Sequence, residues 1–84
     1  QREKLKFSFK EQREYDQIDE VIADLEAKIE QTEQEIRDNA SDYTALQELT
    51  EQKEQLEEEL AQKMERWVYL NDLAERIAAQ NQKS

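Results

Sequence analysis

Carboxylates are the most abundant side chains in this sequence that could take part in chemistry. The 84 residues include 22 Asp and Glu but no His and no Cys, so the usual proton shuttle and the thiolate metal ligands are missing. Consecutive acids such as Glu57-Glu58-Glu59 point about 100° apart on a helix and do not converge on a cation. No Gly is present to form a phosphate-binding loop. We therefore expect no catalytic residue, no metal site and no cofactor in this fragment.

Basic residues form a second group and lie toward the two ends of the chain. Residues 1–13 have a charge of +3 (five basic, two acidic), residues 14–62 of −14 (three and 17) and residues 63–84 of +1 (four and three), within a total of −10. Aromatic residues accompany these cations, a combination typical of nucleic-acid contact sites. Alternatively, the cations only balance nearby acids. The candidate nucleic-acid-binding residues are Lys4, Lys6, Lys10, Arg13, Arg66 and Arg76.

Two heptad stripes predict the helices that position these residues. Apolar residues alternate at spacings of three and four, which is the pattern of a coiled coil. Ser8-Phe9-Lys10-Glu11 has the form of a capping box at the start of the first helix. We predict helices over about 9–38 and about 43–79, with fraying in 1–4 and 79–84. The first stripe is Tyr15, Ile18, Ile22, Leu25, Ile29, Thr32 and Ile36, and the second is Leu46, Leu49, Lys53, Leu56, Leu60, Lys63, Trp67, Leu70, Ala74 and Ile77.

A short polar cluster predicts the turn between the helices, at about residues 39–42. Asn39 is expected to end the first helix in a left-handed conformation, because no Gly is available. Ser41 or Asp42 is expected to cap the second helix. So short a connection forces neighbouring helices to run antiparallel. The predicted fold is all-α, a monomeric two-helix antiparallel coiled-coil hairpin, in which paired residue numbers add to about 82.

This pairing gives expectations for the residues between the helices. Lys53 and Lys63 interrupt the second stripe, and we expect their ammonium groups to reach acids of the first helix. Trp67 is expected to stack on Tyr15 in an aromatic core. Phe9 is assigned to that core as well, whereas Phe7 and Tyr69 are left open between core and surface. The acids expected near Lys53 are Glu26, Glu30 and Glu33, and those near Lys63 are Asp16 and Asp19.

Two stretches resemble a known family. They are Lys4-Leu5-Lys6-Phe7-Ser8-Phe9-Lys10-Glu11-Gln12-Arg13-Glu14 and Glu65-Arg66-Trp67-Val68-Tyr69-Leu70. Both resemble the C-terminal coiled-coil domain of Uup-like ABC-F proteins, which opens with a Lys-Leu-Ser-Tyr-Lys-Glu-Gln-Arg-Glu phrase and closes with an Arg-Trp pair. The compact turn departs from relatives that have a longer segment containing Pro. Contacts made by the tip in relatives are therefore not transferred.

The resemblance implies a parent protein with two ATP-binding cassettes that acts on the ribosome or on nucleic acid (rRNA, tRNA or DNA). ATP would bind only to those cassettes, which lie outside this fragment. The alternative is a generic coiled-coil spacer or oligomerisation element. A chaperone hairpin would need apolar tips, and this tip is polar.

No stretch approaches the ~18 apolar residues of a membrane span, and the chain begins with Gln rather than Met, so we expect a cytoplasmic piece of a longer protein.

Overall fold

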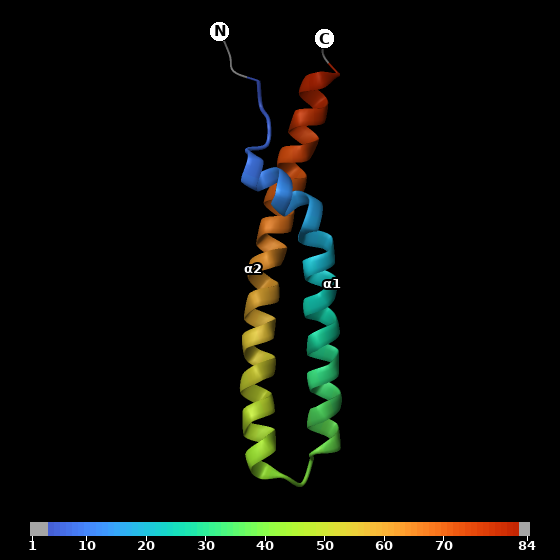
Figure 1. The fold of residues 1–84 in the computed structure, drawn as a ribbon, viewed down its shortest axis with the longest axis vertical. Helices are drawn as coiled ribbons and strands as arrows, with labels where there is room; N and C mark the ends of the chain where they lie inside the picture. The colour runs from blue at the N-terminus through green and yellow to red at the C-terminus, as the bar shows by residue number, and fades with distance from the viewer. Residues whose placement is uncertain (1–3, 83–84) are drawn as a thin grey trace.

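The computed structural model describes residues 4–82, which form two long helices. Helix α1 spans Phe9–Asp38 and helix α2 spans Tyr43–Asn81. They pack antiparallel, so the start of α1 and the last turns of α2 lie toward the same end of a hairpin that measures 65 × 17 × 16 Å (Figure 1). The predicted all-α hairpin is confirmed. Neither helix of the described part is long and apolar enough to cross a bilayer.

The start of α1 is capped as its sequence predicts. The Ser8 hydroxyl accepts a hydrogen bond from the Glu11 N–H at 3.1 Å, and the Glu11 carboxylate accepts one from the Ser8 N–H at 2.9 Å. Both bonds satisfy backbone donors that have no partner within the helix. The capping box therefore fixes where the extended segment 4–8 ends and α1 begins.

The turn differs from the prediction at Asn39. This residue ends α1 with φ −112° and ψ 29°, and no residue of the described part has a positive φ. A left-handed residue is unnecessary because Asn39 satisfies the last carbonyls in another way. Its N–H and its side-chain amide both donate to the Glu35 carbonyl, and its own carbonyl accepts from the Asp42 N–H at 2.9 Å. Asp42, not Ser41, caps α2 through the Ala45 N–H.

The buried residues between the helices, here called the seam, are few. Ile18, Leu25 and Thr32 are buried at a strict seven-residue interval, and Leu70 of α2 is fully buried. Thr32 is tolerated there because its hydroxyl donates to the Lys28 carbonyl at 2.8 Å. The heptad prediction thus identifies the face that is buried.

The two lysines in the seam behave differently. The Lys53 ammonium lies 3.3 Å from Glu33, so the expectation that it reaches an acid of α1 is confirmed. Within residues 4–82, Lys63 forms no salt bridge with Asp16 or Asp19. Asp19 instead accepts a hydrogen bond from the indole of Trp67, at 2.8 Å.

The aromatic core was only partly predicted. Assigning Phe9 to it was wrong, since this side chain is 79% exposed. Phe9 precedes the buried Ile18 by nine residues, or two and a half turns, so it lies on the opposite face of α1. The predicted stacking of Trp67 on Tyr15 is also wrong. Tyr15 stacks on Phe7, with ring centroids 5.0 Å apart, and Trp67 is 38% exposed.

Candidate nucleic-acid interface

The basic ends of the chain come together at the end of the hairpin opposite the turn, here called the open end (residues 4–15 and 66–82). Segment 4–8 lies there against the last turns of α2 (Figure 1). The Gln80 side-chain amide accepts from the Leu5 N–H at 2.8 Å and donates to the Leu5 carbonyl at 3.0 Å. With the stacking of Phe7 on Tyr15, these bonds hold the segment at two points. Lys4 and Lys6 therefore extend from an anchored backbone.

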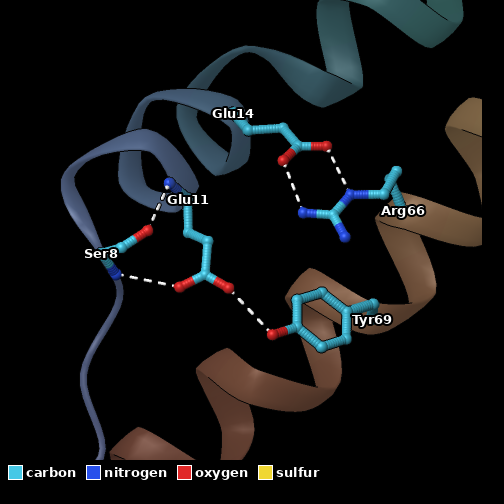
Figure 2. Close-up of polar contacts among 5 residues, drawn as sticks. All are labelled: Ser8, Glu11, Glu14, Arg66 and Tyr69. Carbon is cyan, nitrogen blue, oxygen red and sulfur yellow. Dashed lines mark hydrogen bonds and ion pairs between the residues drawn. The ribbon is translucent and has the colours of Figure 1, made fainter.

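Glu11 connects this segment to α2. One carboxylate oxygen accepts from the Ser8 N–H, and the other accepts from the Tyr69 hydroxyl at 2.8 Å (Figure 2). The Ser8 backbone bond first, and then the Tyr69 hydroxyl, lower the pKa of Glu11 below its ordinary value. The same bond to Glu11 raises the pKa of Tyr69. Glu11 therefore acts as a negatively charged acceptor shared by two elements.

A second connection lies one turn further along α1. Arg66 donates to both oxygens of Glu14, from Nε at 2.8 Å and from a terminal nitrogen at 2.7 Å (Figure 2). This two-point geometry is the strongest form of arginine–carboxylate pair. It lowers the pKa of Glu14 and raises that of Arg66. The Arg66 guanidinium also lies 4.8 Å from the centre of the Tyr69 ring.

The candidate cations therefore fall into two classes. Arg66 is held by Glu14, and Arg76 pairs with Asp72 of its own helix at 3.2 Å. The side chains of Lys4, Lys6, Lys10 and Arg13 are exposed and form neither a salt bridge nor a hydrogen bond within residues 4–82. Arg2 and Lys83, which the sequence also places near this end, lie outside the described residues. Of the candidate cations, Lys4, Lys6, Lys10 and Arg13 are thus available to a polyanion without breaking a contact in the described structure.

Sequence reasoning missed the residues that build this end. Gln80 looked like an ordinary exposed residue, and a main-chain contact has no sequence signature. Glu14 and Arg66 were detectable, because their numbers add to 80, close to the pairing sum, and their charges are opposite. Tyr69 was left open, and its hydroxyl is positioned by Glu11.

Residues 6–72 match the ABC transporter C-terminal domain family. The chain belongs to this family. It is also 40% identical over 72 residues to YfmR of Bacillus subtilis (strain 168), an uncharacterized ABC transporter ATP-binding protein. That alignment covers 86% of this chain but only 11% of YfmR, so the chain corresponds to a small part of its relative. No solved structure matches.

The match to ABC transporter C-terminal domains includes most of the open end. Of the candidate cations, Lys6, Lys10, Arg13 and Arg66 lie within the matched residues, whereas Lys4 and Arg76 lie outside them. The Glu14–Arg66 and Glu11–Tyr69 contacts fall entirely inside. The contacts that join α1 to α2 at the open end are thus part of the family domain in this chain.

Proposed function

We propose that this domain is the C-terminal interaction module of an ABC-F-type, non-transporter ATP-binding protein, and that it contacts nucleic acid or the ribosome through its open end. The observation that carries the proposal is the group of exposed cations without partners in the described structure, Lys4, Lys6, Lys10 and Arg13. Two of them lie on an anchored extended segment and two on the first turns of α1. Such a group suits a phosphate backbone, which attracts cations regardless of sequence.

The net charge of −10 does not prevent this binding, because most of the acidic residues lie far from the open end. The 30 residues of α1 extend about 45 Å at ~1.5 Å per residue. At physiological salt, charges are screened over about 8 Å. A phosphate group at the open end therefore interacts mainly with the nearby cations and little with the acids of the hairpin tip (residues 36–46).

The paired arginines have a supporting role in this proposal. Arg66 holds the first turns of α1 against α2 through Glu14, which fixes the direction in which Lys10 and Arg13 extend. Its guanidinium is occupied on the side that faces Glu14, so we assign it to positioning rather than to phosphate contact. Arg76 makes a single exposed pair within α2, and such pairs contribute little. Arg76 can therefore leave Asp72 and bind a phosphate oxygen at little cost in free energy.

An NMR titration of this chain with a short RNA hairpin, and separately with a DNA hairpin, tests the proposal. We expect shifts confined to residues 4–15 and 66–80. The double variant Lys6→Glu with Lys10→Glu should abolish them. The matched control is Lys28→Glu with Arg37→Glu, which changes the net charge equally at exposed positions outside the open end. This control should bind like the original protein.

The dependence on salt gives a second test. Binding driven by four phosphate contacts should lose affinity with a slope of about −3 to −4 in a log–log plot against salt concentration. Equal losses in both double variants would mean that only net charge matters. Shifts centred on residues 36–46 would overturn the proposal and favour contact through the tip.

The parent protein is part of the same proposal. The relative YfmR carries the name of an ATP-binding protein, and we propose cytoplasmic ATPase cassettes of the ABC-F type before this domain. Sequencing upstream of Gln1 tests this, since the proposal requires a phosphate-binding loop there. The alternative is a spacer or oligomerisation element, for which neither RNA nor DNA should shift any resonance.

A further inference from the structure

One side of α2, next to the seam, has an apolar surface that the proposed function does not use. Met64, Trp67 and Val68 are 48%, 38% and 60% exposed. Their spacing of three and four residues places them on one side of the helix. Ala61 lies on the same side, three residues before Met64. Other exposed large apolar residues, such as Phe9 and Tyr43, lie elsewhere on the hairpin.

Trp67 is held in place within this surface. Its indole N–H donates to Asp19 of α1 at 2.8 Å, and this bond holds the side chain. A partner that packs on the indole therefore loses little side-chain entropy on binding. Tryptophan is enriched among the residues that contribute most to protein interfaces. The exposed ring is consequently better suited to a protein contact than a mobile side chain would be.

Charge indicates which partner fits. The apolar surface is bounded along α2 by Glu57, seven residues before Met64, and by Glu75, seven residues after Val68. On the α1 side it is bounded by Asp19, the acceptor of the indole. A nucleic acid that stacked a base on Trp67 would bring its phosphates toward these carboxylates. A second copy of the chain, with its own charge of −10, would be repelled in the same way.

We propose that this surface binds a basic amphipathic helix of another protein, here called the basic helix. Its apolar side would cover Met64, Trp67 and Val68, and its Lys or Arg residues would face Glu57, Glu75 and Asp19. Residues 57–75 extend about 27 Å at ~1.5 Å per residue, which matches a partner helix of about 18 residues. The interaction uses Met64, Trp67 and Val68 of α2 and none of the cations Lys4, Lys6, Lys10 and Arg13, so it does not depend on nucleic-acid binding.

A defined peptide tests the proposal. The probe is a synthetic peptide of about 18 residues with leucines at three- and four-residue spacing and lysines elsewhere. Trp67 is the one tryptophan of the chain, so its fluorescence reports contact directly. We expect a shift of its emission to shorter wavelength and NMR shifts centred on residues 57–75. A peptide of identical composition with its leucines spread around the helix should bind with an affinity at least about tenfold lower.

Two matched double variants separate apolar docking from charge attraction. Met64→Gln with Val68→Thr removes the apolar surface without changing charge, and it should weaken binding of the peptide about tenfold. Phe9→Gln with Tyr43→Gln removes two exposed aromatic residues elsewhere and should bind like the original chain. Circular dichroism of both variants should show unchanged helix content, since all four residues are exposed.

Three results would overturn the proposal. Equal binding of the two peptides would mean that the lysines alone are attracted to an acidic chain. RNA binding that Met64→Gln with Val68→Thr abolishes would assign the surface to nucleic acid. Self-association at physiological salt that Met64→Gln with Val68→Thr abolishes would assign it to a second copy.

Discussion

Glu11 and Glu14 lie three residues apart on α1, and each uses both carboxylate oxygens. Glu11 bonds the Ser8 N–H and the Tyr69 hydroxyl, and Glu14 bonds two nitrogens of Arg66. These contacts lie at a largely exposed end of the molecule, where ion pairs contribute little to stability. Their effect is therefore mainly geometric: they determine how the first turns of α1 lie on α2.

The pKa of Glu14 should respond to a single substitution. Arg66 lowers it below the ordinary value of 4.5, so Arg66→Gln should return it toward that value. The pKa of Glu11 is lowered chiefly by the Ser8 backbone and by Tyr69, so it should move much less. NMR titration of the two carboxyl carbons measures both values in one experiment. An unchanged pKa of Glu14 in the variant would show that the pair with Arg66 does not persist in solution.

The same pair predicts how one contribution to stability depends on pH. Because the folded pKa of Glu14 is lowered, its contribution is present above the unfolded value of about 4.5 and is lost as pH falls through the folded pKa. Acid also relieves repulsion among the 22 carboxylates, which acts in the opposite direction. The useful quantity is therefore the difference in unfolding free energy between the original chain and Arg66→Gln. It should be below about 1 kcal/mol at pH 7 and approach zero in acid.

Leu70 and Trp67 should differ in their importance for stability. Leu70 is fully buried, so Leu70→Ala should cost about 2–5 kcal/mol through lost burial and a cavity. Trp67 is 38% exposed and does not stack on Tyr15, so Trp67→Ala should cost less than Leu70→Ala despite its larger side chain. Urea unfolding followed by circular dichroism compares the two. A larger loss of unfolding free energy for Trp67→Ala than for Leu70→Ala would indicate that Trp67 belongs to the core.

At the scale of the helices, heptad spacing was sufficient to predict which face of α1 is buried along the middle of the hairpin. Ile18, Leu25 and Thr32 recur every seven residues and are buried, because that interval returns to one face of a helix. The capping box at Ser8 was predictable for a similar reason, since its two bonds depend only on residues three apart.

The ends of the helices were harder to predict, because their contacts depend on the other helix or on backbone geometry. Trp67 occupies a heptad position, yet Asp19 draws its indole to the side of the seam. Asn39 ends α1 without a left-handed conformation, because its amide reaches the Glu35 carbonyl. The exposure of Phe9 could have been predicted, since its distance from Ile18 along the helix places it on the exposed face.

Asp42 is the cap that should matter at the turn. Its carboxylate accepts from the Ala45 N–H at 3.1 Å, whereas Ser41 makes no side-chain hydrogen bond in the described structure. We expect Asp42→Ala to cost about 1 kcal/mol and Ser41→Ala, the matched neighbour, to change the unfolding free energy by less than about 0.5 kcal/mol. Thermal or urea unfolding of the two variants measures this. Equal losses would indicate that the two residues share the cap in solution.

On the scale of the whole molecule, an extended hairpin separates functions that a compact domain would bring together. The exposed cations lie at the open end, and the tip is at the other end of a 65 Å structure. The apolar surface of Met64, Trp67 and Val68 begins just before the open end and lies beside the carboxylate of Asp19. In the proposed function, the cations of the open end would attract phosphate while the acidic remainder of the hairpin would repel it.

The hairpin should be a monomer in solution. The two helices already pack their apolar stripes against each other, and Ile18, Leu25 and Leu70 are buried within one chain. The apolar surface that remains is small, and at a charge of −10 two copies repel each other. Sedimentation equilibrium at low micromolar concentration and physiological salt should therefore give the mass of one chain.

The same measurement near 1 M salt gives a stricter test, because screening then acts over about 3 Å and removes the repulsion. If charge alone keeps copies apart, a dimer should form there, and Met64→Gln with Val68→Thr should abolish it. If the surface is too small for self-association, the mass should stay that of one chain at every salt concentration. A dimer that persists at physiological salt would contradict the prediction and favour the oligomerisation element over the interaction module.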